Sequence, residues 1–365
     1  MSGKPTLAEA MARIERSGGR RRGAAVLREE RVTLSHGSGG KASRALVESV
    51  FAAELSNPLL DPLDDCAVLP AAATGSRLVF TTDSYVVKPL FFPGGNIGRL
   101  AVHGTVNDLA MAGATPLYLS LGVILEEGFP IVDLRRIVAS IRHAADEAGV
   151  SVVTGDTKVV ERGKADGVYL NTAGVGELRP GISLAMDAAR PGDRVLVSGT
   201  LGDHGVAILV ARAELELEST ITSDSAPLHG LAAALVAATG PGLRALKDPT
   251  RGGLATALNE IASASDVGVA VDEAALPIAA EVRGACEIVG IDPLHLANEG
   301  KLVAIVAPEV ASAALAALRA HPLGRNAAII GEAVADPVGM VYLRTAIGGH
   351  RVLDMLAGDA LPRIC

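Results

Sequence analysis

Residues 118–154 hold the pattern that decides the fold: YLSLGVIL (118–125), IVDLRRIVASIRHAADEAG (131–149) and VSVVT (150–154). The middle segment places apolar residues three and four positions apart, as on one face of an α-helix, and Gly149 stands where helices commonly end. The flanking segments are short apolar runs and predict strands. A strand, a helix and a second strand in this order indicate an α/β or α+β domain.

The same alternation of strands and helices continues on both sides of this segment. Strands are predicted at 77–82, 194–198, 267–271, 302–307 and 327–330, and helices at 96–111, 205–213, 252–264 and 281–289. Pro-Gly pairs at 180–181 and 191–192 interrupt the pattern and predict a boundary between two lobes. The expected organisation is a basic, disordered extension at 1–31, an N-terminal lobe at 32–179, a C-terminal lobe at 190–335, and a segment at 336–365 that ends in a mobile tail.

Composition excludes several classes of protein. The chain has 365 residues, of which 49% are hydrophobic, so that two cores can form. Its formal net charge of −8 argues against a general nucleic-acid binder. No apolar run approaches the roughly 20 residues that span a bilayer, and the first residues lack an apolar signal core. We therefore expect a cytoplasmic protein that binds neither membrane nor nucleic acid.

Three cysteines are too few for a disulfide framework, and none of them lies in a CxxC pair. Cys286 falls in a predicted helix and is interpreted as a small buried hydrophobic residue. Cys365 is the last residue of the chain, where the backbone has the most freedom and no packing role is expected. A thiol in that position is a candidate for carrying a chemical group.

Aspartates provide the main chemical signal, because they stand in Gly- or Thr-rich junctions or in an apolar helix. An aspartate among apolar residues costs several kcal/mol unless it is paired or binds a metal. Magnesium in nucleotide sites takes one or two carboxylates together with phosphate oxygens. Each residue could alternatively cap a helix or a turn, but the whole set favours a magnesium–nucleotide site; its members are Asp65, Asp83, Asp108, Asp156 and Asp248.

A glycine-rich loop, HGSGGK at 36–41, offers backbone amides for phosphate binding. It is not a Walker A motif, and although residues 37–42 match a dinucleotide-binding pattern, no second strand and acidic residue follow at the required distance. Two further glycine-rich segments, 171–176 and 198–205, are interpreted as structural turns after strands. His204 in the second segment can point either way.

Taken together, the motifs resemble the aminoimidazole ribonucleotide synthetase superfamily and, within it, the carbamoyl dehydratases of hydrogenase maturation. The resemblance covers the chain from about residue 36 to its end. It rests on HGSGGK (36–41), TTDSYVVKPLFFPGGNIG (81–98), GTVNDLAMAGATPLYLS (104–120), GDTKVVERG (155–163), DPTRGGLATALNEIA (248–262), NEGKLV (298–303) and PRIC (362–365).

The resemblance implies a two-lobed PurM-like fold, in which the N-terminal lobes of a homodimer share a β-barrel and a C-terminal α/β lobe precedes a flexible tail. It also implies ATP-dependent dehydration of a carbamoyl group on Cys365 to a cyanide for [NiFe]-hydrogenase. The implied partners are a HypF-type carbamoyltransferase and a HypC–HypD iron scaffold. The implied magnesium ligands are Asp65, Asp83, Asp108 and Asp248, and the implied ATP contacts are Gly37, Gly39, Gly40, Lys41, Asn107, Gly155, Asp156 and Thr157.

The reaction implied by the resemblance needs a base for the last proton, and two candidates remain open. Glu299 lies in a glycine-bounded turn before a strand, from which it can project into a cleft or stay on the surface. Lys158 would need a lowered pKa to act as a base and could instead contact phosphate, as could Lys41. Other superfamily enzymes, such as selenophosphate synthetase, and a non-catalytic thiol carrier are the alternatives.

Overall fold

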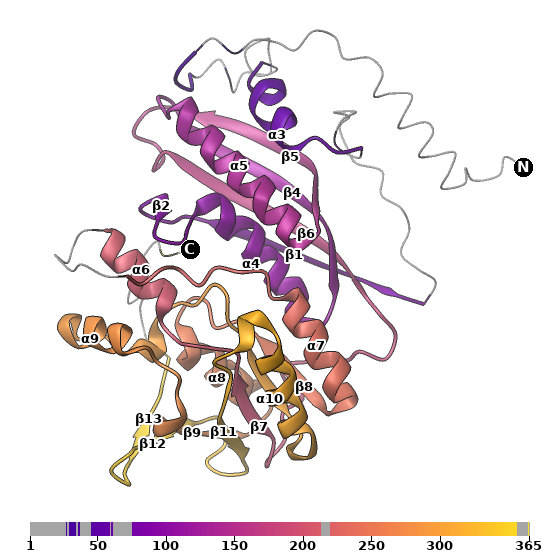
Figure 1. Cartoon of the computed structure of the whole chain (residues 1–365), viewed down its shortest axis with the longest axis vertical. Helices are drawn as coiled ribbons and strands as arrows, with labels where there is room; N and C mark the ends of the chain where they lie inside the picture. The colour runs from indigo at the N-terminus through magenta and orange to yellow at the C-terminus, as the bar shows by residue number, and fades with distance from the viewer. Residues whose placement is uncertain are drawn as a thin grey trace, which may run out of the picture.

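The computed structural model describes residues 27, 29–33, 36, 45–58, 60, 75–212, 220–355 and 364. These residues form two lobes, each organised around its own large β-sheet (Figure 1). The α/β architecture predicted from the sequence is therefore confirmed.

The N-terminal lobe is a four-stranded sheet in the order β1-β6-β4-β5, with helices against one face. Strands β4 and β5 are parallel, and the other neighbouring pairs are antiparallel. The elements of this lobe are η2 (Val47–Ala52), α3 (Ala53–Leu55), β1 (Arg77–Tyr85), the short β2 (Phe91–Phe92) and β3 (Gly95–Asn96), α4 (Ile97–Met111), β4 (Thr115–Glu126), α5 (Ile131–Ala148), β5 (Ser151–Val160) and β6 (Val168–Leu178).

The two long helices of this lobe begin and end where local chemistry directs. The Asn96 side chain accepts hydrogen bonds from the backbone amides of Gly98 and Arg99 and so caps α4. Gly149 ends α5 in the left-handed conformation, with φ of 67°. Helix α4 packs so closely on β6 that a Cβ atom at Gly174 would come within 2.8 Å of the Thr105 side chain. The glycines of 171–176 thus serve packing, as predicted.

Three predictions about strand ends are wrong. Asp83 and Asp156 do not follow their strands but lie within β1 and β5, and the segment 171–176 is part of β6 rather than a turn. The reason is pairing with neighbouring strands: Asp83 lies opposite Thr172, and Asp156 lies opposite Gly122. Strand pairing across the sheet overrides the low intrinsic strand propensity of aspartate and glycine.

The C-terminal lobe is a seven-stranded sheet in the order β13-β12-β9-β11-β7-β10-β8. Its predicted strands and helices are present and each begins within two residues of the expected position. The elements are β7 (Arg194–Val197), α6 (Asp203–Ala211), α7 (His229–Thr239), η3 (Gly240–Gly242), β8 (Leu243–Lys247), α8 (Gly253–Ala264), β9 (Gly268–Asp272), η4 (Glu273–Ala275), α9 (Ala280–Val289), η5 (Pro293–His295), β10 (Val303–Val306), η6 (Pro308–Val310), α10 (Ala311–Ala320), η7 (Pro322–Gly324), β11 (Ala328–Val334), β12 (Val341–Arg344) and β13 (His350–Val352).

Both faces of this second sheet are covered, which explains why its central strands are apolar throughout. On β10, Val303 and Ile305 join the hydrophobic cluster of α8, whereas Ala304 and Val306 join the cluster of α7 and α10. Alternate residues of a strand point to opposite faces, so a strand buried on both sides loses the apolar–polar alternation.

Helix α4 connects the two lobes (Figure 1). Most of its apolar residues belong to the core of the N-terminal lobe, but Ala110, near its end, packs in the cluster of α7 and β10. Asn107 and Asp108 lie just before this junction. The sequence of α4 therefore brings its polar pair to the boundary between the lobes.

The C-terminal segment contains more regular structure than predicted. Residues 348–352 were expected in a tail, but β13 (His350–Val352) pairs antiparallel with β12. Cys286 is buried on α9, as predicted. Most of the predicted extension at 1–31, the HGSGGK loop after His36, and the tail at 356–363 lie outside the described residues. Among the described residues, no helix is both long and apolar enough to cross a bilayer.

Candidate active site

Asp108 projects from α4 toward the neighbouring strand β1. Its Oδ2 atom accepts a hydrogen bond of 2.9 Å from the Thr81 hydroxyl. Burial raises the pKa of Asp108, and the nearby charge of Asp83 adds to the increase. Thr81 and Asp83 are two residues apart on β1 and so face the same side of the sheet, toward α4.

Asp248 follows β8 and brings a third carboxylate from the other lobe. Burial raises its pKa to about 7, and the charges of Asp108 and, less strongly, Asp83 contribute. Carboxylates from β1, α4 and the β8–α8 loop therefore lie close enough for the charges of Asp83 and Asp108 to disfavour ionisation of Asp248. The sequence shows only that these aspartates stand in similar local surroundings, whereas the fold brings them together.

Glu299 is the most deeply buried carboxyl group of this region, with 2% of its surface exposed. Its Oε1 atom is buried and has no hydrogen-bond partner among the described residues. Burial raises the pKa of Glu299 well above its usual range, and the charges of Asp224, Asp248, Asp83 and Asp108 raise it further. We call Asp83, Asp108, Asp248 and Glu299 the acidic cluster.

Polar side chains that the sequence does not single out hold Glu299 in place. The Glu299 backbone amide donates to Asp224 Oδ1 at 3.0 Å, and Lys301 Nζ lies 2.9 Å from Asp224 Oδ2. The amide of Asn298 accepts from Gly202 and donates to the carbonyl of Pro249. Lys301 and Asn298 belong to the NEGKLV motif, but only the folded chain shows that they are buried supports.

Asn107 connects α4 to the same support. Its Nδ2 atom donates to the carbonyl of Ala226 at 3.1 Å and lies 3.4 Å from that of Glu299, while its Oδ1 atom accepts from the amide of Leu228. The side chain is 1% exposed. The structure thus gives Asn107 a positioning role, and its direct contact with ATP stays a prediction.

The acidic cluster suits a metal ion that is shared with phosphate groups. Repulsion among its carboxylates and the orphaned Glu299 Oε1 atom are features that a bound cation would relieve. No three His, Cys, Asp or Glu side chains of the described residues form a ready-made ligand group. Magnesium in nucleotide sites takes one or two protein carboxylates beside phosphate oxygens, so a magnesium site here stays a prediction. Asp65, the remaining predicted ligand, lies outside the described residues.

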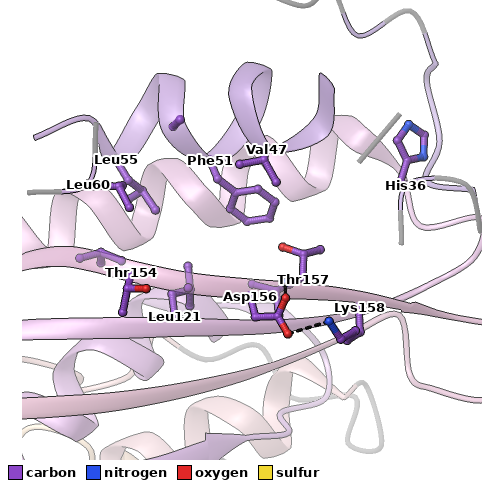
Figure 2. A pocket seen from close by; sticks show the side chains of 14 residues that line it. His36, Val47, Phe51, Leu55, Leu60, Leu121, Thr154, Asp156, Thr157 and Lys158 are labelled. Atoms are coloured by element: carbon purple, nitrogen blue, oxygen red, sulfur yellow. Dashed lines mark hydrogen bonds and ion pairs between the residues drawn. The ribbon is translucent and has the colours of Figure 1, made fainter. Parts of the chain in front are cut away.

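A largely apolar cavity of about 260 Å³ lies at the other edge of the first sheet (Figure 2). Val47, Phe51 and Leu55 form its helical wall. Leu121 on β4 and the residues 154–158 on β5 form its floor. Its size and lining suit a flat apolar group with polar atoms at one end.

The predicted residues Gly155, Asp156, Thr157 and Lys158 all line this cavity. Lys158 Nζ lies 2.8 Å from Asp156 Oδ2, and this hydrogen bond lowers the pKa of Asp156. Both side chains are mostly exposed. In Figure 2 the Thr157 side chain extends toward Phe51, whereas the Asp156–Lys158 pair lies on the opposite side of the strand.

The two candidate bases, Glu299 and Lys158, lie far apart within one folded chain. Gly155, Leu121, Thr172 and Asp83 are paired in a row across the sheet, so β5 and β1 are three strand spacings apart, roughly 14 Å along the sheet. Lys158 is on the outer edge strand β5, whereas Glu299 experiences the charge of Asp83 at the opposite edge.

The end of the chain is described through one residue, Ile364. This side chain is 3% exposed, and its carbonyl oxygen lies 2.9 Å from Nε2 of His204. His204 therefore points inward, toward the chain end. The predicted residues Cys365, Gly37, Gly39, Gly40 and Lys41 lie outside the described residues.

Comparisons with known proteins place this geometry in a family. Residues 63–178 match the AIR synthase related protein, N-terminal domain, and residues 190–344 match the corresponding C-terminal domain. The carbamoyl dehydratase HypE of Rhizobium leguminosarum bv. viciae is 58% identical over 335 residues, which is 92% of this chain and 95% of the relative.

Solved structures agree with the sequence comparison. The crystal structure of the hydrogenase maturation protein HypE in complex with ATP is 50% identical and superimposes with a TM-score of 0.87, covering 91% of this chain and 99% of that one. A chain of the crystal structure of a HypE–HypF complex is 48% identical, with a TM-score of 0.75, and covers 86% of this chain and 100% of that one. The chain belongs to the HypE carbamoyl dehydratase family of AIR synthase related proteins.

Proposed function

We propose that this protein uses ATP to dehydrate a carbamoyl group on the thiol of its own Cys365, which yields a thiocyanate that supplies cyanide for [NiFe]-hydrogenase assembly. One observation carries the proposal. The Oε1 atom of the buried Glu299 carboxyl group, which has no hydrogen-bond partner among the described residues, lies among further carboxylates, and Ile364 is docked inside the protein. The site therefore combines a proton acceptor, acidic groups and the chain end.

The reaction divides into two steps that need different groups. The amide oxygen of the S-carbamoyl group first attacks the γ-phosphorus of ATP, ADP leaves, and one N–H proton is released to water, so that the group becomes an imidate with phosphate on its oxygen. A base then removes the remaining N–H proton, the C–O bond breaks, and inorganic phosphate leaves behind a nitrile. The first step depends on alignment and on neutralising charge rather than on a protein nucleophile.

Glu299 fits the role of the base in the second step. Its burial and its acidic neighbours raise its pKa, so that the carboxylate, once formed, binds a proton strongly. The contacts of Asp224 and Asn107 with its backbone fix its position. Lys158, exposed on β5 and paired with Asp156, fits contact with phosphate better than proton abstraction.

Magnesium would be held by Asp83, Asp108 and Asp248, together with Asp65, and would neutralise the charge of the phosphate groups. The support is that the charge of Asp83 adds to the raised pKa of Asp108, and that the charges of Asp108 and Asp83 add to the raised pKa of Asp248. Within the chain, Thr81 orients Asp108 by its hydrogen bond to Oδ2.

ATP would extend between the two places that the predicted residues occupy. The apolar cavity of β4, β5 and η2 fits the nucleobase. The phosphates would then run toward the acidic cluster, with Gly37, Gly39, Gly40 and Lys41 of the glycine-rich loop as donors. The HypE structure with bound ATP supports this assignment of ligand.

We further propose that two copies of the chain pair through the open face of the four-stranded sheet to form a shared barrel. Large apolar side chains are exposed on this face: Leu78 is 65%, Phe80 70% and Ile124 42% exposed. Register places Lys158 opposite Ile124, on the same face. Association would bury these side chains and bring Lys158 against the second copy.

The thiocyanate must be made in one place and used in another, so the tail has to exchange partners. A HypF-type carbamoyltransferase would load Cys365, and a HypC–HypD scaffold would receive the cyanide, all in the cytoplasm. The solved HypE–HypF complex supports the first partner. Residues between 356 and the chain end would swing between these proteins and the acidic cluster.

Mass spectrometry of the C-terminal peptide tests the proposal. Incubation with the carbamoylating partner should add about 43 Da, and ATP should then remove about 18 Da, as expected for carbamoylation followed by loss of water through oxygen activation. Glu299→Gln should retain the first change and lose the second. A chain that carries the carbamoyl group but never loses water, although it binds ATP, would instead be a thiol carrier.

A further inference from the structure

His204 is buried in the first turn of α6 with both ring nitrogens engaged. Its Nδ1 atom lies 2.8 Å from the Ser223 hydroxyl, and its Nε2 atom lies 2.9 Å from the carbonyl oxygen of Ile364. A carbonyl oxygen can only accept, so Nε2 carries the hydrogen and the Ser223 hydroxyl donates to Nδ1. Burial lowers the pKa of His204, which keeps the ring neutral in this tautomer.

The carbonyl that His204 binds belongs to the peptide bond that joins Ile364 to Cys365. The Ile364 side chain is 3% exposed and lies in the same hydrophobic cluster as Phe92, Val206 and Leu296. Phe92 also packs edge-on against the His204 ring, with centroids 5.6 Å apart and an interplanar angle of 87°. One hydrogen bond and one apolar contact thus hold the chain end.

This docking point adjoins the support of Glu299. Ser223, which orients the His204 ring, also donates its backbone amide to the carbonyl of Pro93 at 2.8 Å. The next residue, Asp224, accepts the backbone amide of Glu299. Residues 223 and 224 therefore contact both the ring that binds the chain end and the backbone amide of Glu299.

We propose that His204 is a positioning residue that holds the last peptide bond of the chain and so presents the Cys365 thiol to the acidic cluster. The proposal rests on the proposed function and adds to it a residue and a contact. The segment 198–205, which the sequence suggests only as a turn, then has the further task of aiming this imidazole. The hydrogen bond from His204 stabilises the inward position of the chain end, in which Ile364 is docked, over an outward position in which partner proteins would bind the tail.

The contact is a neutral hydrogen bond in a buried setting. Its loss should shift the balance between inward and outward tail by about three- to tenfold, the usual net worth of such a bond. That shift is small enough for partners to overcome and large enough to measure. It acts in opposite directions on the two reactions, because an outward tail accepts a carbamoyl group more readily and undergoes dehydration less readily.

Alkylation of Cys365 by iodoacetamide measures the outward population directly. The full-length chain, without ATP or partner, is sampled over time, and the C-terminal peptide released by cleavage before Asp359 is quantified by mass spectrometry. We expect His204→Leu to raise the alkylation rate about three- to tenfold. His204→Gln, which can place an N–H near the former Nε2 position, should restore a rate close to that of the unaltered chain.

His103→Leu is the matched control. His103 is also fully buried and its Nδ1 atom also bonds a serine hydroxyl, that of Ser225, but it has no contact with Ile364 among those described. Its replacement should leave Cys365 alkylation unchanged. An equal rise in both leucine variants would overturn the proposal, because the effect would then come from general loosening around residues 223–225.

Ile364→Ala provides a second route if His204→Leu does not fold. It changes only the chain end, and we expect it to raise Cys365 alkylation by at least as much as the loss of the hydrogen bond. No change in a folded His204→Leu variant, or in Ile364→Ala, would refute the proposal. Since alkylation needs neither ATP nor a carbamoyl group, a positive result would stand even if dehydration were absent.

With carbamoylated protein, the same variants separate positioning from stability. His204→Leu should load carbamoyl faster than the unaltered chain and lose water more slowly at saturating ATP, and His204→Gln should reverse both changes. A purely structural role would lower the melting temperature and slow both reactions together, which would contradict a positioning role.

Discussion

Replacing Lys301 with Met tests whether the support beneath Glu299 depends on one buried ion pair. Lys301 Nζ lies 2.9 Å from Asp224 Oδ2, and the two side chains are 11% and 4% exposed. Two unit charges at that distance attract by about 6 kcal/mol at an effective dielectric constant of 20. Desolvation of both groups cancels most of this attraction, but Lys301→Met leaves Asp224 desolvated without it. We expect the free energy of unfolding to fall by about 3–5 kcal/mol.

Urea denaturation of the full-length chain, followed by circular dichroism, measures this loss. The double variant Lys301→Met/Asp224→Asn is the matched control, because Asn keeps an oxygen that can accept the Glu299 amide but carries no charge. We expect it to recover most of the stability lost in the single variant. Equal losses in the single and double variants would refute the reasoning, since the cost would then not come from an unpaired charge.

The pH dependence of this stability has a definite sign. Burial alone raises the pKa of Asp224, but the charge of Lys301, its hydrogen bond and the hydrogen bond from the Glu299 amide outweigh burial and hold that pKa below its ordinary value of 3.8. The stabilisation is therefore present above pH 3.8 and is lost as pH falls through the lower folded pKa. In Lys301→Met burial dominates, so the stability of the variant falls as pH rises above 3.8. The gap between the two proteins should close in acid.

Two further predictions concern packing and charge elsewhere in the chain. Gly300→Ala should lower the free energy of unfolding by more than about 1–3 kcal/mol, because a Cβ atom there would collide with the Asp224 carbonyl. Gly284 has open space around it, so Gly284→Ala should be neutral or slightly stabilising. Urea denaturation of both variants measures the difference. Arg344→Met should raise the pKa of Glu332, because a hydrogen bond from Arg344 lowers it, and carbon NMR titration measures the change. The stabilisation from this pair is present above pH 4.5 and is lost as pH falls through the folded pKa. An unchanged titration of Glu332 would disprove the pairing.

Much of the fold can be predicted from the sequence because local signals agree with the tertiary structure. The apolar spacing of 131–148 and the following Gly149 fix a helix wherever it packs, and Asn96 caps α4 through its own side chain. Strand limits are less accessible. The extension of β5 to Val160 through a glycine and an aspartate depends on its pairing with β4, which no local property of the segment indicates.

The candidate site can be predicted in part for the same reason. Asp108 is conspicuous as a charge in an apolar helix, and that setting is a local property. Asp224 stands in a polar segment that looks like an ordinary loop, and its role arises from Lys301, 77 positions away. His204 is similar, because the atom that it binds is 160 positions away. Residues whose function depends on distant partners are not visible in the sequence alone.

Helix α4 has a consequence for how water is kept from the reaction. Helix α4 contributes side chains to two hydrophobic clusters, so closure of one lobe onto the other would disturb the packing of Ala110. Under the proposed function, the chain end is the element that enters the site and can seal it. With Ile364 seated beside His204, an inward chain end would cover the site and keep water from the reacting groups. Under the proposed function, ATP would be shielded from hydrolysis while the chain end is inward and open to water while it is outward.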